Sequence, residues 1–378
     1  MTPAVKASVI VPVHGNWAVA SRALEILRER ADGREVIVVD DASPDGTGDR
    51  LEQHADFALV RNERNVGFAA ACNQGATRAS GSRFCFLNSD AFVEPGALDA
   101  LERALEPAGV GAAAPALLNQ DGTLQEAGGA IGSDGATFPL GRGHQAGDPA
   151  WCFQREVDYG SGACLLVERA AFERLGGFDE AYAPGYYEDA DLCLRLAESG
   201  LSTVLEPAAR VTHLQYASGS EARARTLVKR NRRTFLARWG SRLARRPIVL
   251  SARAWPHRSL ALRDAIAATR FLVFDDPQLA ATLTSIWRHA RVTLVGNEQA
   301  PDRVERAQPE QLERWLDERR FHYSAVLAAE LEPSLIETLD QTQPQAPRVA
   351  DASADSAEAL VAELASVGIA PPGMEPRG

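Results

Sequence analysis

Short apolar runs of the kind that form buried β-strands recur along the first 90 residues of this 378-residue chain. They are rich in Val, Ile, Phe and Leu, they end in polar residues, and they lie at 8–11, 36–39, 57–60 and 84–87. Between the first two, residues 18–30 have the spacing of a helix. Strand–helix alternation predicts a parallel sheet with right-handed crossovers, and uninterrupted apolar runs are typical of strands buried on both faces. We therefore expect an α/β fold in which a mostly parallel sheet is flanked by helices.

This pattern is interrupted before the chain reaches its middle. Residues 119–150 are rich in Gly, Asp and Pro and poor in long apolar runs. We expect a long, partly irregular segment there, which in a compact domain usually has a function. A basic stretch follows at 223–246, and its apolar residues recur at roughly helical spacing. It predicts an amphipathic helix, which we interpret as a solvated helix that covers the core.

A second and weaker α/β pattern begins after Pro247. We expect strands and one helix there, the strands at 271–274, 292–295 and 323–328 and the helix at 309–320. No glycine fingerprint of a dinucleotide site accompanies them. We therefore predict a first domain over 1–246, a small α/β accessory region over 247–370 and a disordered tail over 371–378.

Composition excludes some functions and favours a compartment. The formal net charge of −11 argues against a general nucleic-acid binder, whose surface is normally basic. The five cysteines are scattered without a C-x-x-C pair, so we expect reduced, buried thiols. We expect neither a signal peptide nor a membrane-spanning helix, because the sequence shows no leader pattern and no run of about 18 apolar residues. The prediction is a cytoplasmic protein that works, if it acts at a membrane, from the inner face.

Polar residues follow the predicted strands where ligands of parallel sheets bind, at the carboxyl ends. Asp40 and Asp41 end the second strand, where a carboxylate can accept a hydrogen bond from a pyrimidine N–H or a ribose hydroxyl. Asn88 and Asp90 follow the fourth strand, and the carboxylate of Asp90 suits Mg²⁺ or Mn²⁺ on a diphosphate. Each motif has a plainer interpretation as a helix N-cap.

Two further sites lie later in the chain. Glu188 and Asp189 stand at the start of a predicted helix, beside aromatic residues. A rigidly held carboxylate there is a good general base for an acceptor hydroxyl, and the alternative is simple helix capping. His213 follows a strand-like segment, and a single histidine of this kind is more often structural than a ligand.

Together, the order and spacing of these motifs resemble glycosyltransferase family 2, the inverting enzymes with a GT-A fold. The resemblance runs from residue 8 to about 240. It is carried by the segments 9–16, 38–47, 62–75, 87–90, 176–180, 187–192 and 211–213. The later α/β region resembles, more faintly, a Rossmann-like half of other sugar-transfer proteins.

The resemblance implies a division of labour among the motifs. Asp189 is the implied catalytic base with Glu188 beside it, and Asp90 and His213 are the implied ligands of Mg²⁺ or Mn²⁺. The residues implied to bind the nucleotide sugar are Pro12, Val13, His14, Asp40, Asp41, Asn65, Gly67, Asn73 and Asn88.

One residue departs from the family pattern. Asn88 replaces the first Asp of the metal-binding D-x-D motif. Its amide keeps an oxygen acceptor but loses the charge, so we expect a contact to ribose or water. This version resembles the rhamnosyltransferase-like branch and hints at a deoxysugar donor such as dTDP-rhamnose.

The predicted function is sugar transfer from a nucleoside diphosphate to a hydroxyl of a glycan, lipid-linked or protein acceptor, in surface polysaccharide or glycoprotein synthesis. Two alternatives remain, a sugar-nucleotide nucleotidyltransferase and a non-catalytic binding module. The first would need a basic loop after the first strand, where this chain has no basic residue before Arg22. For the stretch 223–246, peripheral contact with anionic headgroups is the alternative to a solvated helix. For the later region we expect packing, homodimer formation or acceptor docking.

Overall fold

The structure is a computed structural model of the 378-residue chain. It describes residues 6–243 except 54–55, 133, 149–150, 152–153 and 216–220. Beyond residue 243 it describes six strands and residues 337 and 341. The chain divides into two compact units, the first made of residues 1–129, 139–148 and 156–235 and the second of the remainder. The boundary predicted at residue 246 stays a prediction.

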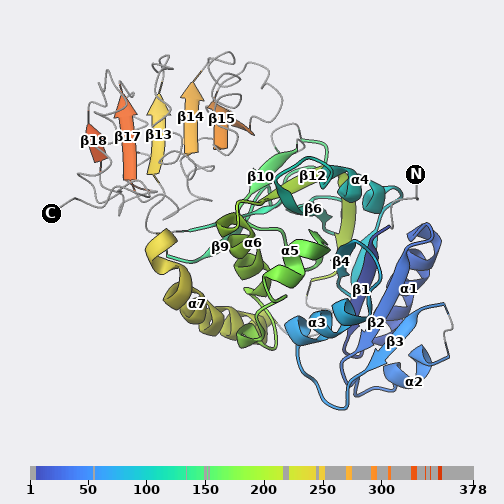
Figure 1. The fold of residues 1–378 in the computed structure, drawn as a ribbon. Coiled ribbons are helices and arrows are strands. Elements are labelled where there is room, and N and C mark those ends of the chain that lie inside the picture. The colour runs from blue at the N-terminus through green and yellow to red at the C-terminus, as the bar shows by residue number, and fades with distance from the viewer. Residues whose placement is uncertain are drawn as a thin grey trace. The chain divides into compact units, whose positions relative to one another are not determined.

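A ten-stranded, mostly parallel sheet organises the first unit (Figure 1). Its order is β10-β12-β6-β11-β4-β1-β2-β3, with β5 paired to β12 and β7 paired to β6. The strands are β1 (Ser8–Val13), β2 (Glu35–Asp40), β3 (Ala58–Arg61), β4 (Arg83–Leu87), β5 (Ala91–Val93), β6 (Val110–Leu118), β7 (Leu124–Glu126), β10 (Arg155–Val157), β11 (Cys164–Glu168) and β12 (Ser202–His213). The predicted mostly parallel α/β fold is confirmed.

Helices alternate with these strands along the chain (Figure 1). They are α1 (Trp17–Arg30), α2 (Thr47–Leu51), α3 (Phe68–Arg78), α4 (Ala97–Ala104), α5 (Arg169–Arg174), the short 3-10 helix η1 (Glu180–Tyr182), α6 (Glu188–Glu198) and α7 (Glu221–Leu243). Among the described residues, no helix has the length and apolar content needed to cross a membrane.

The core lies where the sequence predicts buried strands. Val9, Ile10 and Val11 of β1 are each at most 1% exposed, as expected for a strand covered on both faces. The described cysteines are reduced and buried, as predicted, and they are Cys72, Cys85, Cys164 and Cys193.

Strand register brings the polar residues of separate motifs to one edge of the sheet. Parallel pairing sets Val13 beside Asp40 at the ends of β1 and β2. Strand β11 runs antiparallel to β4 and pairs Cys164 with Leu87, so the residues before β11 meet the residues after β4. On the far side, β12 pairs its last residue, His213, with Ala91.

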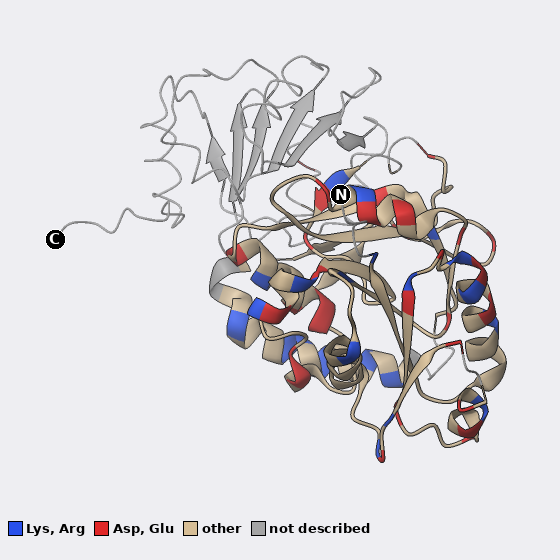
Figure 2. Cartoon of the chain, turned by 45° about the vertical axis from the view of Figure 1, so that its right-hand side comes forward, with Lys and Arg blue, Asp and Glu red and all other residues tan. Residues whose placement is uncertain are grey.

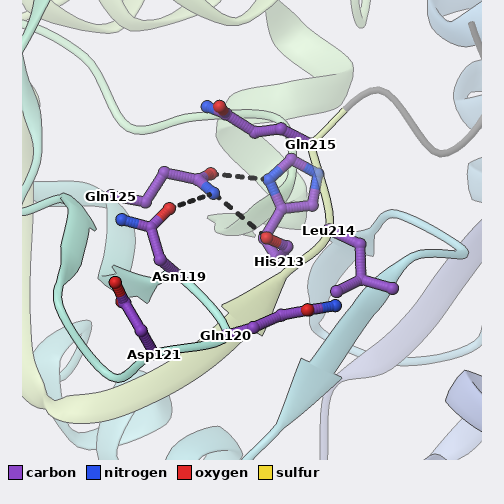
Figure 3. Close-up of a pocket in the computed structure, with 7 residues that line it drawn as sticks. All are labelled: Asn119, Gln120, Asp121, Gln125, His213, Leu214 and Gln215. Carbon is purple, nitrogen blue, oxygen red and sulfur yellow. Dashed lines mark hydrogen bonds between the residues drawn. The ribbon is translucent and has the colours of Figure 1, made fainter.

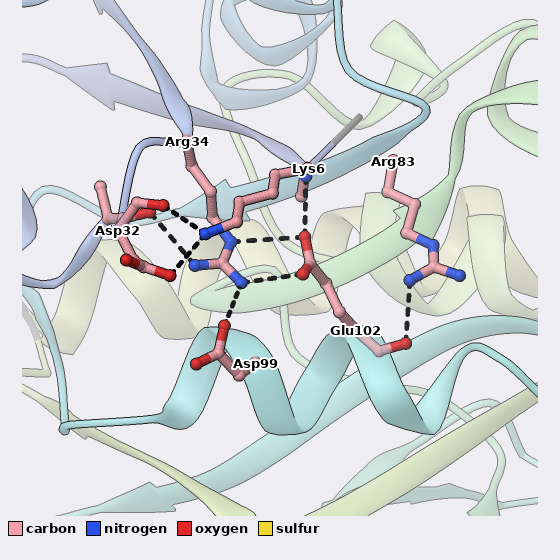
Figure 4. Close-up of polar contacts among 8 residues, drawn as sticks. Lys6, Asp32, Arg34, Arg83, Asp99 and Glu102 are labelled. Atoms are coloured by element: carbon pink, nitrogen blue, oxygen red, sulfur yellow. Dashed lines mark hydrogen bonds and ion pairs between the residues drawn. The ribbon is translucent and has the colours of Figure 1, made fainter. Parts of the chain in front are cut away.

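A cluster of ion pairs lies at the other end of the strands, next to the amino ends of β1 and β2 (Figure 4). The Arg34 guanidinium, itself buried, binds the carboxylates of Asp99 and Glu102 of α4. Glu102 also accepts a hydrogen bond from the backbone N–H of Ala7, and its carbonyl accepts one from Arg83. These partners satisfy the buried charge of Arg34, so this cluster has a structural role away from the polar strand ends.

The segment 119–150 is more regular than its composition predicts. It contains β7, which pairs antiparallel with β6. It also contains β8 (Gly129–Ile131) and β9 (Thr137–Pro139), which form a separate two-stranded sheet. These strands have three residues each, too few for a period to show in the sequence.

Helix α7 corresponds to the predicted amphipathic helix. Its described buried residues recur along one face, and they are Ala224, Asn231, Phe235, Trp239 and Leu243. Lys and Arg residues occupy much of the remaining surface of this helix (Figure 2).

The second unit contains a six-stranded, all-parallel sheet of order β16-β15-β14-β13-β17-β18. Its strands are β13 (Pro247–Ser251), β14 (Arg270–Phe274), β15 (Arg291–Val295), β16 (Glu305–Ala307), β17 (Ala325–Ala329) and β18 (Arg348–Ala350). The three strands predicted here are confirmed as β14, β15 and β17. A strand order that reverses beside β13 is the doubly wound arrangement of Rossmann-like sheets. The helix predicted at 309–320 and the tail at 371–378 lie outside the described residues.

Candidate active site

The loops after β1 and β2 are joined by hydrogen bonds. Nδ1 of His14 donates to the carbonyl oxygen of Asp41 at 2.7 Å, and the backbone N–H of Asp41 donates to the carbonyl of Val13 at 2.8 Å. Pro12 and Val13, both predicted to bind the nucleotide, lie within β1, and the side chain of Val13 is buried. His14 follows the last residue of β1 and is exposed. Its imidazole ring therefore lies at the carboxyl end of the strand, where a ligand of a parallel sheet would bind.

Asp41 organises the loop that leads into α3. Its Oδ1 accepts hydrogen bonds from the side chain of Asn62 at 3.0 Å and the backbone N–H of Val66 at 2.8 Å. Its Oδ2 accepts one from the backbone N–H of Gly67 at 2.9 Å. The buried carboxylate is therefore compensated by protein donors, and it holds the exposed Asn65 at the outside of this loop.

Asp40 is engaged in the same way. Its Oδ1 accepts from the backbone N–H of Ser43 at 3.0 Å, and its Oδ2 accepts from Nε of Arg61 at 3.2 Å. Both acidic residues thus fix, through protein contacts, the loops at the carboxyl ends of β1 and β2, where the nucleotide is predicted to bind; this part of the site is called the nucleotide edge below. The prediction that one of them binds base or ribose stays a prediction.

The side chain of Asn73 links two distant segments of the chain. Its side-chain oxygen accepts from the backbone N–H of Phe178 at 2.9 Å, and its nitrogen donates to the carbonyl of Phe178 at 2.9 Å and to Glu180 at 3.1 Å. These contacts use the acceptor and both donors of the carboxamide. Asn73 ties α3 to the segment before η1, and its predicted contact with the donor stays a prediction.

Asp90 and His213, which are 123 positions apart in the sequence, meet at the strand ends. Nε2 of His213 lies 3.3 Å from Oδ1 of Asp90 and 3.4 Å from Nδ2 of Asn88. The structure therefore brings together the two predicted metal ligands and the Asn that replaces the first Asp of the motif.

Gln125 fixes the orientation and the tautomer of this histidine (Figure 3). Nδ1 of His213 lies 2.7 Å from Oε1 of Gln125, while the amide nitrogen of Gln125 donates to the carbonyl oxygen of His213 at 3.0 Å. An acceptor at Nδ1 keeps the proton there and leaves the lone pair of Nε2 facing Asp90. Sequence reasoning missed Gln125, which lies in the segment predicted to be irregular.

The residues present fit a divalent cation shared with a diphosphate. Two ligands at about 2.1 Å from an octahedral ion, at right angles, lie about 3.0 Å apart, close to the 3.3 Å between His213 and Asp90. Among the described residues no group of three His, Cys, Asp or Glu side chains could hold a metal alone. Mg²⁺ and Mn²⁺ sites with one or two protein ligands take the rest from phosphate oxygens and water, so this pair suits a cation that arrives with the donor.

Replacing Gln125 by Ala is expected to weaken Mn²⁺ affinity by about 10- to 100-fold, because the ring of His213 loses the partner that sets its tautomer. Mn²⁺ titration in the presence of a nucleoside diphosphate, followed by the electron paramagnetic resonance of the free ion, measures this. Gln120, Gln125 and His213 line one pocket of 430 Å³. Gln120→Ala is the matched control, because Gln120 makes no described contact with the His213 ring. Equal affinities in the two variants would contradict the assignment.

Asp189 lies at the start of α6, against the turn before β11. Its Oδ2 accepts a hydrogen bond from the backbone N–H of Gly162 at 2.9 Å. A Cβ at Gly162 would come within 3.2 Å of the Phe68 ring and 3.6 Å of Asp189 Oδ2, so glycine permits this close approach. Burial raises the pKa of Asp189, and the N–H groups of Gly162 and Ala190 oppose that rise. A raised pKa makes the ionised carboxylate a stronger base.

The two neighbouring acids in α6 have other surroundings. Asp191 is fully buried and binds Nε of Arg195 at 2.7 Å, so it has a structural role. Glu188 is 5% exposed, and its Oε2 has no described hydrogen-bond partner. Burial, followed by the charge of Asp189, raises the pKa of Glu188 well above its usual range. The neutral form of Glu188 is therefore favoured, and Asp189 is the better candidate for the base.

Glu126, on β7, is an acidic neighbour of Asp189 that sequence reasoning missed. Burial and the charge of Asp189 raise its pKa to about 8, while the charge of Arg142 and the N–H of Ser161 oppose the rise. Its Cα pairs with Leu117 across β6 and β7. The only sequence signal was an acidic residue within an unusual glycine-rich segment.

Glu126→Gln is expected to stabilise the protein increasingly as pH rises. The folded-state pKa of about 8 exceeds the ordinary 4.5. Between these pH values the unfolded chain releases this proton while the folded protein retains it, so the unfolding free energy of the wild type falls as pH rises and levels off above about pH 8. The full shift corresponds to about 5 kcal/mol at most. Urea unfolding of both proteins at pH 5.5 and 8.5 measures the difference, with the exposed Glu198→Gln as control. A difference that does not change with pH would refute the buried, protonated Glu126.

Comparison with known proteins places these features in context. The family model described as "Glycosyl transferase family 2" matches residues 8–176. The N-acetylglucosaminyl-diphospho-decaprenol L-rhamnosyltransferase of Mycobacterium tuberculosis is 30% identical over 229 residues, which are 53% of this chain and 73% of that protein. The O-antigen biosynthesis protein RfbC of Myxococcus xanthus is 34% identical over 182 residues, which are 44% of this chain and 14% of that protein.

A third relative, the pre-mycofactocin glycosyltransferase of Mycobacterium tuberculosis, is 31% identical over 216 residues, 54% of this chain and 42% of that protein. This chain thus spans less than half the length of that protein and of RfbC. Among solved structures, GalNAc-T7 with UDP, GalNAc and Mn²⁺ has a TM-score of 0.48 and 17% identity, over 56% of this chain and 44% of that one. That likeness is too distant to support an inference about substrate.

Proposed function

The chain belongs to glycosyl transferase family 2, and from this premise we propose that it moves a sugar from a nucleoside-diphosphate sugar to an acceptor hydroxyl with inversion at the anomeric carbon. One observation carries the proposal. The turn before β11 joins the two halves of the site, because Gly162 donates to Asp189 and the carbonyl of Ala163 accepts the backbone N–H of Asn88. The proposed base and the two residues proposed to hold the cation therefore lie on either side of one short turn.

In the proposed reaction the acceptor oxygen attacks the anomeric carbon of the donor. Asp189 takes the proton of that hydroxyl, and the bond between the anomeric carbon and the diphosphate oxygen breaks in the same displacement. A divalent cation held by Asp90 and His213 would stabilise the negative charge of the departing nucleoside diphosphate. A single base and no covalent intermediate give inversion.

The nature of the substrates is a further part of the proposal. Asn88 in place of an acid, together with relatives named as rhamnosyltransferases, supports a deoxysugar donor such as dTDP-rhamnose. The acceptor is a glycan, a lipid-linked sugar or a protein hydroxyl. We propose action at the cytoplasmic face of a membrane, with the basic surface of residues 223–246 as the peripheral contact, and homodimer formation through the region after residue 246.

The test is a panel of UDP-, GDP- and dTDP-sugars with Mn²⁺ or with EDTA, in which released nucleoside diphosphate is measured. Metal-dependent release from one donor is the expected result. Release of pyrophosphate from a nucleoside triphosphate and a sugar phosphate would support a nucleotidyltransferase instead. Donor binding without turnover, across the panel and with simple hydroxyl acceptors, would support a binding module and overturn the proposal.

A further inference from the structure

A single buried asparagine of α7 holds the loop that precedes the candidate base. Asn231 is 1% exposed. Its side-chain nitrogen donates to the carbonyl oxygens of Tyr182 at 2.7 Å, Gly185 at 2.9 Å and Tyr186 at 2.9 Å. Because an NH₂ group has two hydrogens, one of them is shared between two of these acceptors. Three surrounding carbonyls identify this atom as the nitrogen of the carboxamide, and one side chain thus contacts much of the loop.

The backbone of this loop needs such an external partner. Tyr186 and Tyr187 have φ values of 76° and 80°, the left-handed region that side chains other than glycine rarely adopt. Such a residue is strained and persists only when surrounding contacts determine its conformation. Tyr187 is also the N-cap of α6, so the strained pair stands directly before Glu188 and Asp189.

The same face of α7 also holds the N-cap residue itself. Phe235, one turn after Asn231, packs against Tyr187 with ring centroids 5.0 Å apart. Arg230 adds a hydrogen bond to the carbonyl of Ala183. Consecutive turns of one helix therefore fix the carbonyls of the loop and the aromatic ring at its end.

The other side of the loop rests on the nucleotide edge. The backbone N–H of Phe68 donates to the carbonyl of Pro184 at 2.9 Å. At Gly67, a Cβ would lie 2.8 Å from Cα of Pro184, so the two backbones are in contact. Because Asp41 holds Gly67, a continuous set of contacts runs from the nucleotide edge through this loop to Asn231.

We propose that Asn231 is a positioning residue that sets Asp189 for proton abstraction through the loop 182–187. The assignment rests on the proposed sugar transfer for its effect on turnover, while its effect on the loop is independent of any substrate. Without the three hydrogen bonds, the positive-φ backbone before α6 relaxes and the carboxylate of Asp189 leaves its place beside Gly162. Asn231 touches no reacting atom and acts only through this geometry.

Asn231→Ala in the full chain tests the proposal in two ways. Hydrogen exchange of the amides of 182–190 is expected to rise while that of β1 and β4 stays unchanged. With the nucleotide sugar that supports turnover, kcat is expected to fall by about 10- to 100-fold, since displacements of about 1 Å cost up to 10²-fold, and the KM for the donor stays within about twofold. The exposed Thr234→Ala of the same helix should match the wild type in both measurements.

A double-mutant cycle separates positioning of the base from a general loss of structure. If Asn231 acts through Asp189, Asn231→Ala should cost little further activity in an Asp189→Asn background. Equal losses in both backgrounds, or unchanged exchange at 182–190, would overturn the proposal. Should no nucleotide sugar be turned over by the wild type, the exchange result still decides whether Asn231 holds the loop, and the proposed sugar transfer fails separately.

Discussion

Replacing Asp189 by Asn is expected to lower turnover by about 10²- to 10⁴-fold, the usual contribution of a general base. The amide has the same shape, and its oxygen can still accept the hydrogen bond from Gly162. It cannot take a proton from an acceptor hydroxyl at neutral pH. Donor binding should survive, because in the proposed reaction Asp189 contacts the acceptor hydroxyl and not the diphosphate of the donor.

The measurement is initial-rate turnover beside a titration of the donor followed by calorimetry. Glu198→Gln is the matched control, because Glu198 is an exposed acid at the other end of α6. Turnover near that of the wild type in Asp189→Asn would remove Asp189 from the mechanism. Loss of donor binding together with turnover would instead give this residue a structural role.

Replacing Asp90 by Ala is expected to have the second-largest effect. The proposed cation would stabilise the leaving diphosphate by several kcal/mol, which corresponds to about 10²- to 10³-fold in rate. Asp90 is the one charged partner of the proposed pair and lies 3.3 Å from His213. Excess EDTA should abolish turnover by the wild type, and added Mn²⁺ should restore it.

Titration of the rate with Mn²⁺ measures this effect. Asp90→Ala should need a much higher Mn²⁺ concentration and reach a lower maximal rate. Asp121→Ala serves as control, because Asp121 is an exposed acid whose carboxylate accepts hydrogen bonds from the backbone N–H and the hydroxyl of Thr123. An Asp90→Ala variant that responds to Mn²⁺ like the wild type would show that the cation binds elsewhere or that none is needed.

The sheet and its polar edge could be predicted because both leave strong local signals. Uninterrupted runs such as that ending at Val39 are required by burial on both faces. The polar residues after them, such as Asp41 and Asp90, stand where the runs stop. Parallel register then places them along one edge without further information.

The partners of those residues could not be predicted, because they depend on contacts between distant segments. Gln125 meets His213 across 88 positions, and Asn73 meets Phe178 across 105. The side chain of Asn or Gln is uncharged and follows no periodic pattern in the sequence, so nothing in the sequence predicts its hydrogen-bond partner. For Asp41, the sequence indicated an acid at a strand end but not that the loop before α3 supplies its donors.

The burial of Asn231 could have been predicted from its position in the sequence. This residue lies four residues after Leu227 and four before Phe235, on the apolar stripe of the predicted helix. A polar residue on such a stripe is buried and needs partners. The surrounding basic residues favoured a solvated helix, and that interpretation overlooked Asn231, a polar residue that faces inward.

The most direct test of one-base displacement is the anomeric configuration of the sugar as it is first released. With a high concentration of protein, Mn²⁺ and the donor that supports turnover, water takes the place of the acceptor. Proton NMR in the first minutes then identifies the anomer before it equilibrates. Direct displacement predicts the configuration opposite to that of the donor. Release of the same configuration would contradict direct displacement assisted by Asp189 as the single base.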